Sequence, residues 1–198
     1  MIVPPKSPMP CHYLASQYAK RVISLIDVDI CCTSINRNML RRVTGRSLDE
    51  DKDLNTATVL SYLDFEDDTP VLTARVRQNM VTLCSLFDVK CEFAPALGFL
   101  SLMNINQGLN HLIDFLGGHL EEHALERLLS ELSGLSSDEV ANCLIRLQQN
   151  GVLLIDRWLN EPQDITMPSS MLYVLTTEVV VSKEQLLKHA LCASPPPH

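Results

Sequence analysis

The sequence predicts a mainly α-helical protein with a small β-hairpin near its C-terminal end. Apolar residues recur at the three- and four-residue spacing of amphipathic helices over most of the chain from residue 12 to residue 149. Two later segments, 152–158 and 172–181, are short and rich in apolar and β-branched residues, which favours strands. These observations indicate a helical body followed by one pair of strands.

The composition is that of an ordinary globular protein. With 198 residues, of which 46% are hydrophobic, the chain is long enough to bury one substantial core or two small ones. No stretch approaches the roughly 20 apolar residues of a membrane-spanning helix, and residues 1–6 lack the apolar region of a signal peptide. We therefore expect a cytoplasmic protein with no membrane partner.

The N-terminal part is expected to be an arm followed by helices. Residues 1–11 are rich in proline and should form a disordered arm. The spacing of apolar residues predicts a helix over Tyr13–Ile26. A short second helix, capped by Thr33 or Ser34, should run through Arg42.

The middle of the chain predicts further helices with one ambiguous segment. A third helix is expected over 54–63. The pattern that follows fits a helix better than a strand, but residues 70–78 could also be a strand, and periodicity alone leaves both open. Residues 91–117 should form a helical connector of one or two helices, broken near Gly98 and residues 104–107.

Residues 120–158 have the clearest pattern. An apolar stripe through Leu132 predicts a helix that ends at Gly134. Ser136 and Glu139 have the spacing of a capping box, in which each side chain bonds the other residue's backbone N–H at the start of a helix. The second helix should end at Asn150, before a strand over 152–158.

The C-terminal segments complete the prediction. The strand over 172–181 should pair antiparallel with 152–158, which makes the 13 residues from 159 to 171 a long loop. Ser182 and Gln185 form a second capping box at the start of a last helix, and residues 182–198 are expected to be this helix and a proline-rich tail.

Residues 117–181 resemble the DNA-binding domain of winged helix-turn-helix transcription regulators, of the cyclic-AMP-receptor and MarR-like types. The resemblance lies in Leu132–Val140, in the spacing to Leu144 and Leu147, and in Gln149–Val152 at the entry to the strand. It implies that the second helix lies in the DNA major groove and that polar residues near its start contact base edges. The residues that would then contact DNA are Ser136, Ser137, Glu139, Asn142 and Arg146.

The charge distribution points to a different nucleic-acid contact. Residues 117–160 contain seven acids and three arginines, a net charge of −4, which repels DNA. Residues 1–46 contain seven Lys and Arg against two Asp, a net charge of +5. In the predicted second helix, Arg37 and Arg41 lie one turn apart and could bind phosphates together with Asn38, Arg42 and Arg46. The alternative is that these arginines pair with the acids of residues 49–53 and 64–68.

No motif in the sequence predicts an enzyme, a metal site or a cofactor. Residues 119–123 match the H-x-x-E-H pattern of zinc proteases, but a five-residue match is weak and no third ligand is evident. The seven cysteines are odd in number and include no CxxC pair, so we expect reduced thiols that pack as small hydrophobes.

The sequence therefore favours a DNA-binding transcription regulator with two winged-helix-like units, residues 12–90 and 118–181. Such regulators generally bind paired half-sites, so a homodimer on double-stranded DNA is expected. The dimer surface could be formed by the predicted last helix, over 186–191, and by Leu109, Leu112, Ile113 and Leu116, although ordinary core packing is the commoner reason for such residues. The alternative function is an acidic tandem winged-helix scaffold that binds protein partners at its acidic surface without contacting DNA.

Overall fold

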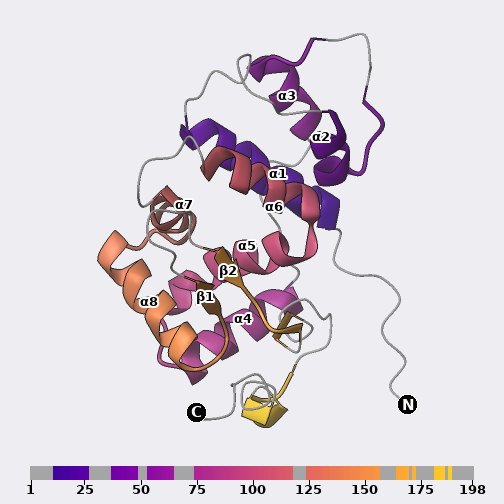
Figure 1. Cartoon of the computed structure of the whole chain (residues 1–198). Coiled ribbons are helices and arrows are strands. Elements are labelled where there is room, and N and C mark those ends of the chain that lie inside the picture. Colours follow the sequence, from indigo (N-terminus) through magenta and orange to yellow (C-terminus); the bar gives the residue numbers. More distant parts are fainter. Residues whose placement is uncertain are drawn as a thin grey trace, which may run out of the picture.

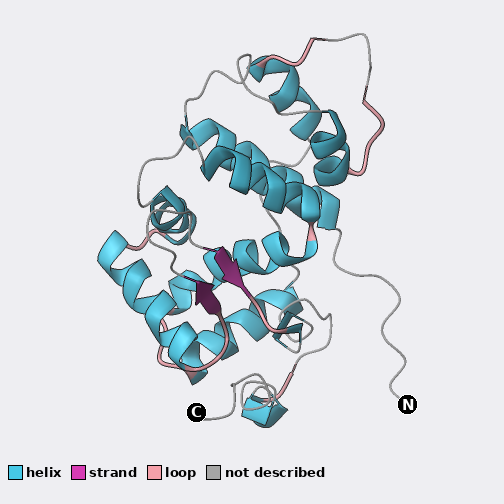
Figure 2. Cartoon of the chain, viewed as in Figure 1, coloured by secondary structure: helices cyan, strands magenta, loops and turns pink. Residues whose placement is uncertain are grey.

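The structure is a computed structural model. It describes residues 11–26, 37–48, 53–64, 74–117, 124–156, 164–169, 171–172, 181–185 and 187–188. This part of the chain is mainly helical and contains a two-stranded antiparallel hairpin (Figure 2), as the sequence predicts.

The elements follow one another as helices until the hairpin. In chain order they are α1 (Cys11–Ile26), α2 (Arg37–Thr44), α3 (Thr56–Leu63), α4 (Ala74–Leu86), the short 3-10 helix η2 (Cys91–Phe93), α5 (Ala94–Ile105), α6 (Gln107–Gly117), α7 (Ala124–Ser133), α8 (Ser137–Gln149), β1 (Leu154–Asp156) and β2 (Asp164–Thr166). Residues 183–185 and 187–188 are also helical.

Helix α5 is the centre of the fold. In Figure 1 it runs through the middle of the molecule, with α1 and α6 on one side and α4 on the other. It packs against α1, α4, α6, α7 and β2. Residues 96–103 are all buried, because this helix is apolar around its whole circumference and is covered on every side.

The helical connector divides at Asn106 and not at Gly98. Gly98 is buried inside α5, where the helix continues without a break, so the expected break at this residue is wrong. The backbone N–H of Asn106 donates to the carbonyl of Leu102 at 2.8 Å and ends α5. The Oδ1 atom of the same residue accepts from the N–H of Leu109 at 2.9 Å in the first turn of α6. One asparagine therefore ends one helix and caps the next.

The N-terminal helices agree with the sequence pattern. Helix α3 begins one residue after Asn55, whose Oδ1 accepts from the N–H of Thr58 at 2.8 Å. The alternative of a strand is wrong for residues 74–78, which belong to α4 and bury Val76. Residues 70–73 and 31–36 lie outside the described part of the chain.

Leu109 and Leu112 do not form an exposed apolar surface. Both side chains are fully buried in the core, so ordinary packing accounts for them. Cys84 and Cys143 are also buried, and both are free thiols, as predicted; Cys91 is a free thiol that is exposed. Burial raises the pKa of Cys84 to about 12, so this thiol stays protonated at neutral pH.

In the described part of the chain, β1 pairs with a segment that precedes the predicted second strand. Residues 154–156 pair antiparallel with residues 164–166, and Ile155 lies opposite Ile165. The prediction that the partner strand begins at Leu172 is wrong, because the N–H groups of Met171 and Leu172 both donate to the carbonyl of Pro168 in a turn of helix. Residues 173–180 lie outside the described part of the chain.

A side chain from α5 bonds the segment that forms β2 and the residue that follows it. The Oδ1 atom of Asn104 accepts from the N–H of Met167 at 3.1 Å. Its Nδ2 atom donates to the carbonyls of Leu100, at 2.9 Å, and Ile165, at 3.4 Å. Asn104 thus satisfies backbone groups at the edge of β2, which a short apolar segment could not satisfy alone.

Replacing Asn104 by alanine is expected to lower the free energy of unfolding by about 1–3 kcal/mol, because the Met167 N–H loses its partner in a partly buried place. Urea denaturation measures the loss, and hydrogen exchange at Ile165 and Met167 should become faster. Gln78→Ala, at an exposed position of α4, is the matched control and should change stability by less than about 0.5 kcal/mol. Equal stability of the two variants would contradict the assigned role of Asn104.

Among the described residues, no helix combines the length and the apolar character needed to cross a membrane.

The capping box predicted at Ser182 is present: the N–H of Gln185 donates to the Ser182 hydroxyl at 3.3 Å, and the N–H of Ser182 donates to Oε1 of Gln185 at 3.0 Å.

Candidate functional site

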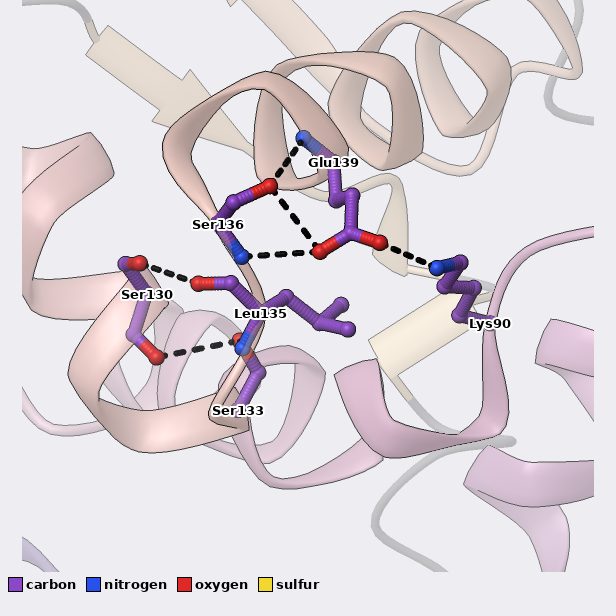
Figure 3. A network of polar contacts seen from close by, with 6 residues as sticks. All are labelled: Lys90, Ser130, Ser133, Leu135, Ser136 and Glu139. Carbon is purple, nitrogen blue, oxygen red and sulfur yellow. Dashed lines mark hydrogen bonds and ion pairs between the residues drawn. The ribbon is translucent and has the colours of Figure 1, made fainter.

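The corner between α7 and α8 is fixed by local hydrogen bonds (Figure 3). Gly134 has a positive φ of 72°, a backbone conformation that glycine adopts without steric cost. The hydroxyl of Ser130 donates to the carbonyl of Leu135, and the N–H of Leu135 donates to the hydroxyl of Ser133 at 3.3 Å. These bonds satisfy polar groups within the turn and set the direction in which α8 leaves it.

The predicted capping box begins α8. The N–H of Glu139 donates to the Ser136 hydroxyl at 3.4 Å, and the N–H of Ser136 donates to the Glu139 carboxylate at 2.9 Å. Figure 3 also shows the ammonium group of Lys90 donating to the other oxygen of this carboxylate. Glu139 is therefore engaged with its own helix and with the segment before η2.

A second ion pair joins α8 to the same segment. The guanidinium group of Arg146 donates to the carboxylate of Asp88 and, at 3.0 Å, to the carbonyl of Asp88. Lys90 and Asp88 precede α5 in sequence, and both contact the flank of α8 that carries Glu139 and Arg146. Two of the residues that the resemblance assigns to DNA contact are thus bound to the protein itself.

The opposite flank of α8 is held by the hairpin. The Nε2 atom of the Gln148 side-chain amide donates to the carbonyl of Ile155 in β1 at 3.3 Å. Val140, Cys143, Leu144 and Leu147 face the core between these flanks. Helix α8 therefore keeps one remaining face toward solvent, and both of its borders are fixed by hydrogen bonds.

That remaining face is mixed polar and apolar. We call Asp138, Asn142, Ile145 and Gln149 the α8 stripe; all four are exposed, and their spacing of four, seven and eleven residues places them on one side of the helix. Ile145 is 40% exposed, and Leu154 in β1 is 47% exposed. The stripe includes one acid and no Lys or Arg.

The second predicted surface lies on α2. Asn38, Arg42 and Arg46 are exposed, whereas Arg37 and Arg41 are half-buried. Leu40 and Val43 on the other side of this helix are fully buried. Helix α2 packs on α6, α1 and α3, so the predicted arginines and the start of α8 belong to different regions of the molecule (Figure 1).

Asp64, at the end of α3, contacts two basic side chains. The ammonium group of Lys20 lies 2.8 Å from its carboxylate, and the guanidinium group of Arg46 donates to its carbonyl at 3.4 Å. The salt bridge of Asp64 is made by Lys20, and Arg46 contacts a backbone carbonyl, so the pairing of the arginines with acidic side chains stays a prediction. Residues 49–52 and 65–68 lie outside the described part of the chain.

The contact between Lys90 and Glu139 should make the stability of the protein depend on pH. Hydrogen bonding to Lys90 and to Ser136 lowers the pKa of Glu139 from its ordinary value of 4.5 to about 2. A carboxylate whose pKa is lower in the folded protein stabilises that protein above the unfolded pKa, and this contribution is lost as the pH falls from about 4.5 toward 2. The effect should be small, because both side chains are well exposed.

Glu139→Gln should therefore reduce the acid sensitivity of the protein. Thermal unfolding of the wild type and the variant at pH 7 and at pH 3 measures the effect, and the difference in Tm between them should shrink at pH 3. Glu131→Gln, at an exposed position of α7, serves as the control for loss of a carboxylate. An unchanged difference in Tm across this pH range would contradict the assigned contact.

Sequence reasoning missed four residues of this region: Asp88, Lys90, Ile145 and Leu154. The first two lie about 50 residues before the side chains that they contact, and no local pattern indicates such a pairing. Ile145 could have been recognised, because it falls outside the apolar stripe formed by Val140, Leu144 and Leu147. A single exposed apolar residue is common on protein surfaces, and it indicates a contact surface when further exposed apolar residues adjoin it.

The chain matches no protein-family model, no curated protein and no solved structure. In the described ranges, no group of three or more His, Cys, Asp and Glu side chains could hold a metal ion. His119 and His123, which carry the H-x-x-E-H pattern, lie outside those ranges.

Proposed function

We propose that this chain is an adaptor that binds a protein partner through the α8 stripe and the adjoining hairpin. In this proposal residues 117–181 form a winged helix-turn-helix unit, which the order α7, tight turn, α8 and antiparallel hairpin supports. The unit serves as a docking surface and not as a DNA reader. This proposal adopts the alternative function, the acidic scaffold that binds protein partners.

The observation that carries this proposal is the ion pair that engages Arg146 of α8. Arg146 is the only cation of this helix, and its guanidinium group is bound to Asp88. Phosphate neutralisation by Lys and Arg supplies much of the affinity of DNA-binding proteins. An exposed Ile145 on α8 and an exposed Leu154 on the hairpin that Gln148 bonds to α8 suit a protein surface better than a phosphate backbone.

DNA binding through α2 is the second candidate function. Arg42 and Asn38 are exposed on this helix, and residues 37–48 contain four arginines and no acid. Arginine and asparagine side chains can donate to phosphate oxygens and fix a protein on a duplex. In this case the chain would be a transcription regulator that contacts DNA outside its helix-turn-helix corner.

Two measurements on the full chain separate these functions. Binding of a mixed-sequence DNA duplex is measured across a salt series that starts at about 50 mM. Binding that weakens steeply with salt and is reduced by Arg42→Ala would overturn the adaptor proposal in favour of the regulator. The adaptor proposal expects no binding of the duplex by the wild type.

The second measurement places a photo-crosslinking phenylalanine derivative at position 142 and, as a control, at position 61 in α3. Both positions are exposed, and α3 lies far from α8 in Figure 1. In extracts of the source cells, position 142 should give a protein adduct that disappears when Ile145→Ser is added, and position 61 should not. Adducts that persist with Ile145→Ser, or no adduct at position 142, would overturn the adaptor proposal.

A further inference from the structure

We infer that the partner presents a basic amphipathic helix to the α8 stripe, with Lys or Arg at one end and aliphatic side chains at the other. The inference rests on the proposed function and goes further, because it names the chemistry of the partner. It follows from the polarity, the length and the surroundings of the stripe.

The stripe is polarised along the helix. Asp138 lies in the first turn of α8, whereas Ile145 lies in the second half and Leu154 follows in β1. A binding segment must therefore offer a cation near the start of α8 and apolar side chains near its end. Asn142, between these positions, can donate to or accept from polar groups at the border of a partner.

The charge of the surroundings selects the sign of the partner. Residues 124–156 and 164–169 contain six acids and two arginines, a net charge of −4, and the whole chain carries −8. Asp88 and Lys90, which pair with Arg146 and Glu139, add one charge of each sign, so the region keeps this net charge of −4. Opposite charges across an interface speed association and exclude partners of the wrong sign. A second copy of this chain carries the same negative charge and is disfavoured.

The length of the stripe matches a helical partner. Asp138 and Gln149 are 11 residues apart, which corresponds to about 16 Å along the helix axis, or three turns. A partner helix laid along α8 can present side chains at the same spacing over that distance, the usual arrangement when amphipathic helices dock. Both borders of the stripe are fixed by the hydrogen bonds of Arg146 and Gln148, so little ordering of α8 is required on binding.

The test uses two synthetic 18-residue amphipathic helices that share one Leu and Ile face. One has lysine on its polar face, and the other has glutamate. Binding to the full chain is measured by fluorescence anisotropy at about 50 mM and 200 mM salt. The lysine peptide should bind, more weakly at the higher salt, and the glutamate peptide should not bind.

Variants at the stripe must change this affinity if the site is correct. Ile145→Ser should weaken the lysine peptide about tenfold, and Asp138→Asn about threefold, because each removes one contact of the stripe. The controls are Leu187→Ser, which removes an equally exposed aliphatic residue elsewhere, and Glu184→Gln, which removes an exposed acid of the C-terminal helix. Both controls should leave the affinity unchanged within about a factor of two.

Four results would overturn the inference. Equal weakening by the stripe variants and the controls would mean that the peptide binds only to the net charge of the chain. Preference for the glutamate peptide, or binding of neither peptide, would exclude a basic helix as the partner. The crosslinks at position 142 would then be the remaining test of the adaptor proposal. Self-association of the wild type that Ile145→Ser abolishes would identify a second copy as the occupant.

Discussion

Replacing Gly108 by alanine is expected to push α2 away from α6 and to lower the free energy of unfolding by about 2 kcal/mol. A Cβ atom at this position would lie 2.5 Å from the backbone N of Val43 and 2.7 Å from the backbone C of Arg42. Both atoms belong to the main chain of α2, so no side-chain rotation can relieve the overlap. Alanine is the better helix former by about 1 kcal/mol, but this gain is smaller than the cost of moving one packed helix off another.

Chemical denaturation measures the loss of stability, and hydrogen exchange over residues 37–44 should increase if α2 moves. Gln107→Ala, at the exposed neighbouring position in α6, provides the matched control and should be nearly neutral. If Gly108→Ala proved as stable as this control, the close crossing of α2 and α6 would be incorrect. That crossing holds Arg42 and Asn38 at the surface, so Gly108→Ala should also change any DNA binding by α2.

The second large effect is expected at Phe99, the aromatic residue at the middle of α5. Its side chain is fully buried, and the centroid of its ring lies 5.3 Å from that of Tyr18 in α1. Phe99→Ala removes the ring and leaves a cavity in the centre of the fold, which costs about 3–5 kcal/mol. This loss is large relative to the total stability of a typical domain, about 5–15 kcal/mol, so the variant should unfold at a much lower temperature.

Tyr18→Phe separates packing from hydrogen bonding at the same place. The Tyr18 hydroxyl donates to the carbonyl of Pro95 at 3.0 Å, and burial raises its pKa to about 12, so it remains a donor at neutral pH. The variant keeps the ring and should cost only about 1–2 kcal/mol. A double-mutant cycle of Tyr18→Ala and Phe99→Ala should give a coupling energy of about 0.5–1.5 kcal/mol; purely additive effects would contradict the ring contact.

Much of the helical structure could be predicted because its signals are local. The capping box of Ser136 and Glu139 involves atoms three residues apart, and the turn at Gly134 requires a backbone conformation that its residue type favours. The break at Asn106 lay within the expected range of residues 104–107, whereas the break at Gly98 was wrong. A buried glycine between apolar neighbours is tolerated when packing on all sides holds the helix together.

The hairpin shows the limit of such signals. Residues 172–181 have high β-propensity, and yet the structure pairs β1 with residues 164–166 and turns Leu172 into helix. β-Propensity reflects the surroundings of a strand more than its backbone, so the strand forms where neighbouring groups can satisfy it. Here that neighbour is Asn104, which lies 61 residues before Ile165.

The sequence by itself determined the mainly helical class, the capping boxes at Ser136 and Ser182, the turn at Gly134 and much of the apolar core, because these depend on residues close together in the chain. Only the tertiary structure decided which strand pairs with β1, that Arg146 and Glu139 are bound by Asp88 and Lys90, and that Ile145 and Leu154 remain exposed. The physical reason is the same in each case. These outcomes depend on side chains about 50 or more residues apart, or on what remains uncovered after the helices have packed.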